Sequence, residues 1–574
     1  MAIFIRRKGQ IRDQFCSAEI VRAERASLEI VLPSCLLNFI SGSMDQAHCH
    51  IPFAKTGFFN QLVLDFLAEH PQLRSFYQYS PVRPDFHEAI KAKQLQPIQR
   101  DVLVQALQEQ YATLAPVAAV QENIASLLRP ETFTVCTAHQ PNIFTGYLYF
   151  VYKILQTIRL AADLKAAYPG RHFVPVYYMG SEDADLEELG SIFINGKVLT
   201  WQTKQSGAVG RMQPEGFEEL ITQVKDTLGY GQYADELIAL LREAYLGHDN
   251  IQHATQYLVH ALFGRYGLVV LIPDDASLKR LYIPVMREEL HQHSSFKLVT
   301  ATIEALSQHY KVQANPREIN LFYLMAGARE RIVKEGGSWK VLNSDISFTS
   351  TELEAELQAH PERFSPNVIL RGLFQETILP NVAFIGGGGE IAYWLELQSL
   401  FAHYGVPFPV LLLRNSLLLT NEPAETRRQK LGLSVADLFQ DAQVLINRFV
   451  QTHTNASLVL KEEYNAIEQL FDQLEAKAQK IDVTLVASAA AERLKAIKSI
   501  GKLEHKFLRA EKKKFAWQTE QIRQLKLQLF PLGSLQERKE NFMPWYIHQG
   551  PALFDTLLAA LTPVTDQFIV LRIG

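Results

Sequence analysis

Cysteine is scarce in this sequence, and its few occurrences form no disulfide or metal-binding pattern. The 574 residues contain four cysteines, and no two of them form a Cys-x-x-Cys pair; they are Cys16, Cys35, Cys49 and Cys136. Small secreted domains that depend on disulfides carry an even set of closely spaced cysteines. We therefore expect a protein of a reducing compartment, and the cytoplasm fits best.

The sequence also lacks a strong excess of one charge and a long hydrophobic run. It has 57 Lys and Arg against 61 Asp and Glu, a net charge of −4, which argues against nucleic acid as the main partner. No apolar run reaches the roughly 18 residues that a membrane-spanning helix needs, so no membrane association is expected. The apolar stretch 31–40 lies too far from the N-terminus to resemble a signal peptide.

Short apolar runs alternate with helical patterns over much of the chain, whose length predicts two or three domains. The runs are rich in β-branched or aromatic residues, and they are Phe133–Cys136, Phe173–Met179, Gly267–Pro273, Val382–Gly386 and Phe408–Arg414. Helical segments between such runs favour an α/β fold with a mainly parallel sheet. We place this core in residues 44–420, with insertions near 191–265 and 286–365.

After residue 421 the pattern becomes typical of a coiled coil. Apolar residues recur at heptad spacing and form two seams, one of Leu460, Ile467, Leu474 and Ile481 and one of Tyr464, Phe471 and Ala478. A second long helix is expected over 483–530, with its register interrupted at Gly501. We predict an antiparallel helical pair within a domain of residues 421–530, followed by a segment, 531–574, that returns to the core.

Three polar segments follow predicted strands, where ligands bind in open α/β sheets. They are His139–Gly146, which leads into a helix containing Lys153, then Glu182–Asp185, and the glycine run Gly386–Gly389. Acidic residues at such a place can bind an amine or take up a proton, and glycine amides can bind phosphate. A structural interpretation stays open, because Asn142 or Thr145 could cap a helix and the acids could stabilise a first helical turn.

In this order, these segments resemble one enzyme family. The resemblance is carried by TAHQPNIFTGYLYFVYK, SEDADLEEL, LRGLFQETILPNVAFIGGGGEIAYW and LFPLGSLQERKENFMPWY, which look like segments of the cysteine-adding enzymes of bacillithiol biosynthesis (BshC). It covers roughly residues 51–573 and implies a Rossmann-like core with inserted connecting segments, plus a helical coiled-coil domain that supports a homodimer. It also implies the last step of bacillithiol synthesis, which joins the cysteine carboxyl to the amine of glucosaminyl-malate. Ala184 departs from the family, which usually has a histidine there.

Amide formation in water needs an activated carboxylate, so we expect ATP or ADP to take part and expect no metal. The candidate catalytic residues, for proton transfer and charge stabilisation, are His139, Glu182, Asp183 and Asp185. Arginine forks bind carboxylates through two hydrogen bonds, which makes Arg371 and Arg414 candidate anchors for the malyl group. Further candidates for substrate binding are Gln140, Asn142, Thr145, Lys153, Gln375 and Tyr393. The candidates for nucleotide binding are Gly386, Gly387, Gly388, Gly389, Gln536, Arg538 and Asn541.

Three other functions remain open on the sequence. A Rossmann-type nucleotidyltransferase or adenylate-forming enzyme acting on another small substrate would have a similar histidine-bearing turn, although no KMSKS-like lysine loop is found. A non-catalytic scaffold would use the helical pair alone, and three polar segments argue against it. A metal hydrolase could use His48 and His50 with the acidic residues, but a third ligand nearby is lacking.

Residues 1–43 precede the region of resemblance, and we expect them to be a non-native extension, with Met44 as the true start. Mass spectrometry of the native protein should find Met44 or Asp45 at its N-terminus. Recovery of peptides from residues 1–30 at full abundance would contradict this expectation.

Overall fold

The structure, a computed structural model, describes residues 48–454 and 458–573. The expected extension, residues 1–43, lies outside these residues, as do Cys16 and Cys35. Cys49 and Cys136 are free thiols. No helix within the described residues is both long and apolar enough to cross a membrane.

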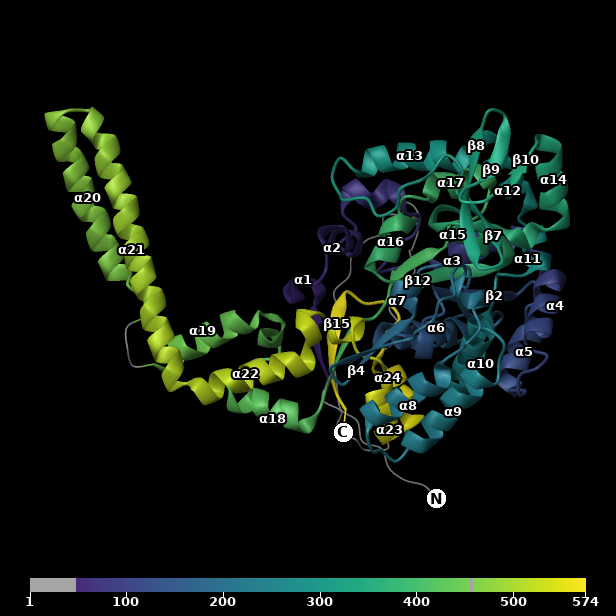
Figure 1. The fold of residues 1–574 in the computed structure, drawn as a ribbon, viewed down its shortest axis with the longest axis horizontal. Coiled ribbons are helices and arrows are strands. Elements are labelled where there is room, and N and C mark those ends of the chain that lie inside the picture. The colour runs from purple at the N-terminus through teal and green to yellow at the C-terminus, as the bar shows by residue number, and fades with distance from the viewer. Residues whose placement is uncertain (1–47, 455–457, 574) are drawn as a thin grey trace, which may run out of the picture. The chain divides into compact units, whose positions relative to one another are not determined.

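The core of the fold is a five-stranded sheet in which all neighbouring strands are parallel. In spatial order its strands are β13 (Val410–Leu413), β12 (Asn381–Gly386), β2 (Thr132–His139), β3 (His172–Met179) and β6 (Val269–Leu271). Each apolar run singled out in the sequence forms one of these strands, which confirms the predicted parallel sheet. β12 and β13 are buried along their whole length, as expected for strands covered on both faces. The long helix α6 (Leu148–Ala167) packs against β2 and β3 (Figure 1).

The strand order reverses at β2. From β2 the chain runs through β3 to β6 on one side, and it later returns to place β12 and β13 on the other side. Ligands of open α/β sheets bind outside the carboxyl ends of the strands at such a reversal. The loops after β2, β3 and β12 therefore meet at one edge of the sheet, and these loops hold the three polar segments.

The described residues form three further sheets. One is antiparallel, within the segment expected as an insertion at 286–365, and its order is β10 (Ser347–Phe348), β9 (Ser338–Val341), β8 (Ala328–Glu335), β7 (Leu321–Met325) and β11 (Phe364–Pro366). A second sheet joins β1 (His48–Pro52), β15 (Gln567–Arg572) and β14 (Leu417–Thr420). The third is a hairpin of β4 (Ser191–Ile194) and β5 (Lys197–Thr200).

The helices fall into groups between these strands. Before β2 lie α1 (Phe53–Thr56), α2 (Gln61–Leu67), α3 (Phe86–Gln94), α4 (Arg100–Gln110) and α5 (Ala118–Ser126). Between β3 and β12 lie α7 (Leu186–Leu189), α8 (Phe217–Leu228), α9 (Ala234–Leu246), α10 (Ile251–Phe263), α11 (Ala276–Arg280), α12 (Ile283–Gln292), α13 (Ser294–Leu306), α14 (Ser350–Ala359) and α15 (Val368–Ile378). After β12 lie α16 (Gly388–Trp394), α17 (Gln398–Tyr404), α18 (Glu422–Lys430), α19 (Ala442–His453), α23 (Met543–Gln549) and α24 (Ala552–Ala560).

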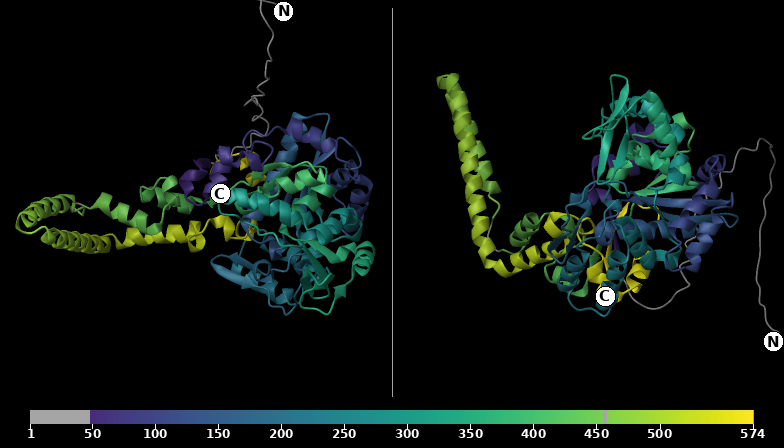
Figure 2. Two further views of the ribbon diagram at one scale, coloured as in Figure 1. Left: turned by 90° about the horizontal axis from the view of Figure 1, so that it is seen from above. Right: turned by 45° about the vertical axis from the view of Figure 1, so that its right-hand side comes forward.

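The predicted helical pair is present as α20 (Lys461–Ile481) and α21 (Thr484–Lys514), which run side by side (Figure 2). Their antiparallel direction follows from contacts at two heights. Arg493 of α21 forms ion pairs with Glu468, Asp472 and Glu475 of α20, and Glu504, further along α21, accepts a hydrogen bond from the amide of Leu460, the residue before α20. The second helix was predicted to reach residue 530. Instead it breaks at Phe515, where the backbone leaves helical geometry, and α22 (Ala516–Leu529) continues.

The hairpin of α20 and α21 leaves apolar side chains on its surface. Leu474 is 39% exposed and Ile481 is 77% exposed, although both belong to the first predicted seam. Leu494 of α21 is also exposed. In contrast, Ala478 of the second seam is buried against the neighbouring helix. The first seam therefore has apolar surface to spare for a partner.

We expect the chain to form homodimers through this hairpin, because exposed apolar side chains gathered on one element favour association. Replacing Leu474 and Ile481 together by lysine should convert the dimer into a monomer, as measured by light scattering at micromolar concentration. The melting temperature should change little, since both side chains are already exposed. Val198→Lys, at an exposed position of β5, is the control and should leave the dimer intact. A wild-type monomer, or a dimer that survives both lysines, would count against this interface.

Candidate active site

A cavity of about 1090 Å³ lies at the carboxyl ends of the core strands. The loops after β2, β3 and β12 line it through His139, Asp183 and Gly387–Gly389. Phe322 and Arg329 of the antiparallel sheet also line it. Its size suits a small-molecule substrate. The three polar segments singled out in the sequence therefore contribute to one site, together with a sheet that the sequence did not connect with it.

His139 is the last residue of β2. Its ring packs against Tyr149 and Phe150, with centroid distances of 5.4 and 5.5 Å. Its Nε2 atom is buried and makes no hydrogen bond within the described part of the chain. Burial, together with the positive charges of Lys153 and Arg414, holds the pKa of His139 well below its ordinary value. The imidazole is therefore neutral at neutral pH and keeps a free nitrogen lone pair, although it is a weaker base than an ordinary histidine.

The turn that follows His139 is strained and is held in place by distant residues. Phe144 and Thr145 have φ angles of +50° and +68°, which are unfavourable for residues with a β-carbon. Asn541 donates hydrogen bonds from Nδ2 to the carbonyl oxygens of Phe144 (2.9 Å) and Gly146 (2.5 Å). The Phe144 amide donates to the Tyr245 hydroxyl at 2.7 Å. Asn541 therefore has a structural role here, which differs from the nucleotide contact expected from the sequence.

A buried lysine joins the loops after β2 and β12. Lys153 donates to the carbonyl oxygen of Ala138 (2.5 Å) and to both carboxylate oxygens of Glu390 (2.9 and 2.8 Å). Glu390 also accepts a hydrogen bond from the amide of Gly387 at 2.8 Å. Burial lowers the pKa of Lys153, and Glu390 opposes that shift. Lys153 does not line the cavity, so its contacts position the loops that do.

Asp183 is held in a buried salt bridge with Arg371 of α15. Arg371 donates from Nη1 to Oδ2 at 2.8 Å and from Nη2 to Oδ1. Gln140 donates from Nε2 to the same Oδ2 at 2.7 Å. Burial raises the pKa of Asp183, but the charge and hydrogen bonds of Arg371 outweigh burial and lower the pKa overall. Such a carboxylate is a poor proton acceptor, which argues against the catalytic role expected for Asp183.

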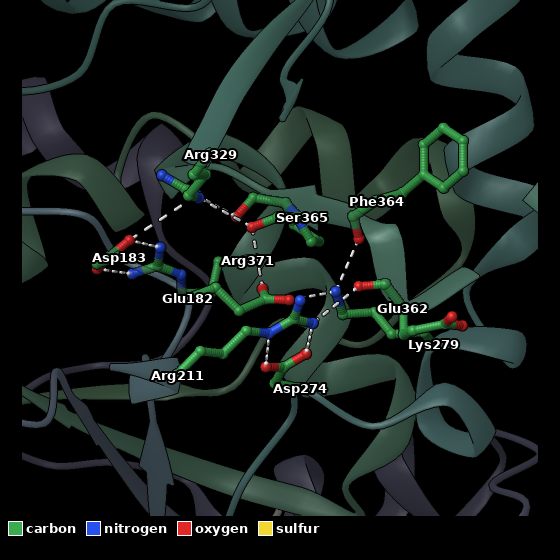
Figure 3. A network of polar contacts seen from close by, with 11 residues as sticks. Glu182, Asp183, Arg211, Asp274, Lys279, Arg329, Glu362, Phe364, Ser365 and Arg371 are labelled. Atoms are coloured by element: carbon green, nitrogen blue, oxygen red, sulfur yellow. Dashed lines mark hydrogen bonds and ion pairs between the residues drawn. The ribbon is translucent and has the colours of Figure 1, made fainter. Parts of the chain in front are cut away.

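The two neighbouring acids have different surroundings. Glu182 accepts hydrogen bonds from Lys279 Nζ (2.5 Å) and Ser365 Oγ (3.1 Å) in a buried network outside the cavity lining (Figure 3). Its partners make it a structural residue, and the catalytic role expected for it does not fit this position. Asp185 is exposed at the cavity and accepts a hydrogen bond from the amide of Glu188 at 3.4 Å, which caps α7. Asp185 remains accessible to a ligand.

Positive side chains outnumber negative ones around the cavity. The lining contains Arg317, Arg329, Arg331, Arg371, Arg414 and Arg538, with Asp183, Asp185, Glu188 and Glu390. Arg414 pairs with the buried Glu537 (2.8 Å) and lies 5.0 Å from the ring centroid of Tyr149. With Arg371 paired with Asp183, Arg414 with Glu537 and Lys153 with Glu390, the charges left over are Arg317, Arg329, Arg331 and Arg538 against Asp185 and Glu188. The cavity should therefore attract anions.

The cavity brings together more than half of the residues that the sequence predicted. These are His139, Gln140, Asp183, Asp185, Arg371, Tyr393, Arg414, Gly387, Gly388, Gly389 and Arg538. The predicted residues outside the lining are Asn142, Thr145, Lys153, Glu182, Gly386, Gln375, Gln536 and Asn541. Gln536, for example, bonds the backbone of Leu419 through both side-chain atoms (2.9 and 3.1 Å), and Gln375 donates to Glu376 (3.0 Å). At Gly386 a β-carbon would lie 2.8 Å from the Phe384 ring, which explains the glycine.

Several lining residues were missed from the sequence. They are Tyr149, Arg317, Arg329, Arg331 and Asn367. Tyr149 lies at the start of α6, just after the first polar segment, and resembles the apolar residues around it. Arg317, Arg329 and Arg331 belong to the expected insertion, and no strand-end pattern marks them. Arginine is hardly more frequent in this insertion than in the rest of the chain, so its composition gives no signal either.

Metal-binding groups are a separate question. Among residues 48–454 and 458–573, no three His, Cys, Asp or Glu side chains lie close enough together to hold a metal ion. The metal hydrolase considered from the sequence therefore gains no support from these residues.

A parallel sheet with an arginine-rich cavity at its strand reversal, joined to a helical hairpin, defines a Rossmann-like domain with a coiled-coil domain. Comparison with known families agrees with this class. The model described as bacillithiol biosynthesis BshC, N-terminal Rossmann-like domain, matches residues 47–415, and the C-terminal coiled-coil domain of BshC matches residues 417–573. The chain belongs to the BshC family of bacillithiol biosynthesis, which confirms the resemblance seen in the sequence.

Similar proteins cover nearly the whole chain. A protein of Flavobacterium psychrophilum named "Putative cysteine ligase BshC" is 42% identical over 525 residues, which is 91% of this chain and 99% of that protein. Proteins of the same name from Flavobacterium johnsoniae and Christiangramia forsetii are each 40% identical, again over 91% of this chain and 99% of their own. A solved structure titled as an arginyl-tRNA synthetase of Campylobacter jejuni covers 77% of this chain and 98% of its own, at 11% identity. Its TM-score of 0.21 is too low to bear on fold or function.

Asp183→Asn should destabilise the protein, because Arg371 and Arg329 would lose their carboxylate. Removing one partner of a buried ion pair costs about 3–5 kcal/mol of the free energy of unfolding, which urea denaturation would measure. Because the pKa of Asp183 is lowered in the folded protein, its stabilisation is complete above the unfolded value of about 3.9. It is lost as the pH falls through the folded pKa. The difference between wild type and variant should therefore stay constant from about pH 5 to pH 8 and shrink only in stronger acid.

Asp185→Asn is the matched control for that measurement. Asp185 is exposed, and asparagine caps a helix about as well as aspartate, so this variant should lose well under about 1 kcal/mol. Equal stability of the two variants would show that the Asp183 salt bridge does not stabilise the fold.

Proposed function

We propose that this protein is a ligase that joins the carboxyl group of L-cysteine to the amine of glucosaminyl-malate, the last step of bacillithiol biosynthesis. Its family, and relatives named as cysteine ligases, support this assignment. In the chain itself, the observation that carries the proposal is His139, a neutral imidazole with an unpaired buried nitrogen beside an arginine-rich cavity. A base next to a cationic cavity suits an amine substrate that also carries carboxylates.

The chemistry assigns His139 a definite task. A new C–N bond forms when the amine nitrogen attacks the cysteine carboxyl carbon, and the nitrogen must then lose a proton. His139 is placed to accept that proton, because burial and the charges of Lys153 and Arg414 keep its ring neutral beforehand. Its lowered pKa makes it a weak base, but a weak base suffices here, because the nitrogen becomes strongly acidic once the C–N bond has formed. The same two cations disfavour the protonated ring, so His139 would release the proton readily after the step.

The glycine turn after β12 supports a nucleotide as the second substrate. A nucleotide would supply the phosphate group that turns a carboxylate oxygen into a leaving group. No atom lies within 4 Å of the place where a β-carbon of Gly389 would stand, so a ligand can approach its backbone. The Gly387 amide already bonds Glu390, which leaves Gly388 and Gly389 as the better candidates for phosphate binding. Arg414 lies next to Gly387, and Arg538 lines the same cavity, so both would add positive charge.

His139→Gln should leave the fold intact and lower the turnover number by about 10²–10⁴-fold, the usual contribution of a positioned base. The assay measures bacillithiol formed from glucosaminyl-malate and L-cysteine, with ATP and ADP supplied in separate reactions. The nucleotide product would distinguish phosphate transfer from adenylate formation. Melting temperatures would be measured on the same preparations.

His253→Gln, at an exposed position in α10, is the control and should retain wild-type turnover. Wild-type turnover in His139→Gln would refute the role of His139 as the base. No amide formation by the wild-type protein with either nucleotide would refute the proposed reaction.

A further inference from the structure

Arg329 of β8 has unused hydrogen-bond donors in the cavity. Its side chain is 9% exposed, and its Nε donates to Ser365 Oγ at 3.1 Å. The guanidinium carbon lies 4.0 Å from the ring centroid of Phe322, which fixes the plane of the group. Nη2 lies 3.4 Å from the Pro366 carbonyl and 3.8 Å from Asp183 Oδ1. Nη1 makes no hydrogen bond within the described part of the chain, so its donors remain for a ligand.

The charge of Arg329 is only partly balanced. Arg329 and Arg371 share the carboxylate of Asp183, and Arg371 already bonds both of its oxygens. Two largely buried guanidinium groups beside one carboxylate leave a net positive charge, which is unfavourable away from water. An anionic ligand that paired with Arg329 would remove this imbalance through charge-assisted hydrogen bonds.

A chain of buried hydrogen bonds sets the direction of Arg329 (Figure 3). Ser365 Oγ accepts from Arg329 Nε and donates to Glu182 Oε2 at 3.1 Å. Glu182 is paired with Lys279, whose side chain is fully buried and also donates to the carbonyl of Phe364 at 2.7 Å. Because the Ser365 hydroxyl donates its hydrogen bond to Glu182, the lone pairs of the serine oxygen are left to accept from Arg329. The guanidinium is thereby fixed before any ligand binds.

We propose that Arg329 is a specificity-determining residue that binds a carboxylate of the amine substrate, and that Ser365 and Glu182 position it. This inference rests on the proposed function, in which that substrate carries the carboxylates of malate. The sequence favoured Arg371 and Arg414 as anchors. Both already hold a protein carboxylate, Asp183 and Glu537 respectively. Arg329 differs from these two in that no carboxylate of the described residues lies within hydrogen-bond distance of its guanidinium, so donors remain for a ligand.

The topology favours a carboxylate of the amine substrate over a nucleotide phosphate at Arg329. Arg329 lies beside Asp183, which follows β3, whereas the glycine turn follows β12. β2 lies between these two strands, with His139 at its end. A substrate held at Arg329 and a phosphate held at the glycine turn would therefore meet at His139.

Isothermal titration calorimetry of the full-length protein without nucleotide tests this inference separately from catalysis. The ligands are glucosaminyl-malate, L-malate, the dimethyl ester of each, and inorganic phosphate. The acids should bind the wild type at least about 10-fold more tightly than their esters. Arg329→Gln should weaken acid binding by about 10- to 100-fold and leave ester binding unchanged. Arg329→Lys keeps the charge without the planar fork, so its affinity for the acids should lie between those of the wild type and Arg329→Gln.

Variants of the positioning residue and a matched control complete the experiment. Ser365→Ala should weaken acid binding less than Arg329→Gln does. Ser365→Thr keeps a hydroxyl and should bind the acids about as tightly as the wild type. Arg363→Gln is the control, because Arg363 pairs with Glu356 (2.7 Å) outside the cavity lining, and it should bind the acids as the wild type does.

Five outcomes decide the inference. Equal binding of acids and esters by the wild type, or acid binding that survives Arg329→Gln, would overturn it. If Arg329→Gln bound neither the acids nor the esters, the inference would also be overturned, because the change would then reflect distortion of the cavity. If inorganic phosphate bound more tightly than malate, and if this binding were lost in Arg329→Gln, the position would be assigned to a phosphate instead. A wild type that binds malate through Arg329 but forms no amide would support this inference and refute the proposed function.

Discussion

The buried ion pair between Lys153 and Glu390 is the constraint on which the rest of the site depends. A buried ammonium group is stable only when its charge and its donors are paired, and Lys153 finds its partners in Glu390 and the Ala138 carbonyl. These partners belong to the end of β2 and to the turn after β12, while Lys153 itself belongs to α6. Since Glu390 also holds the Gly387 amide, one lysine fixes the separation of the two strand ends between which a ligand would lie.

Some of the other charged side chains around the cavity are fully paired and others are not, and this difference decides whether they shape the cavity or attract a ligand. Arg371 with Asp183 and Arg414 with Glu537 form complete pairs, which give the cavity walls of fixed shape. Arg329 lacks a complete pair, so attraction for an anion remains. Positive charge near the ring also keeps His139 neutral. Under the proposed function, the positive charges that attract an anionic substrate thus also help to keep the His139 ring unprotonated.

The sequence predicted the sheet and its functional edge because both leave local signals. Strands buried on both faces appear as continuous apolar runs, and polar residues directly after parallel strands must meet at one edge. Roles that depend on tertiary contacts leave no such signal. Glu182 and Asp183 are adjacent in the sequence, yet one pairs with Lys279 and the other with Arg371. Arg329 lies in an antiparallel strand of an insertion, where nothing local indicates that its side chain reaches the cavity.

The strained turn after β2 gives a physical reason for the return of the C-terminal segment to the core. Backbone conformations such as those of Phe144 and Thr145 cost roughly 1–3 kcal/mol each and persist only when their surroundings enforce them. Asn541 supplies two of the enforcing hydrogen bonds from a position 397 residues away from Phe144. β15, from the same segment, pairs with β14 and β1, so the segment docks through a sheet as well as through this side chain. Local sequence cannot set such a turn, because the side chain that holds it comes from the other end of the chain. The geometry of the site is therefore conditional on the whole chain having folded.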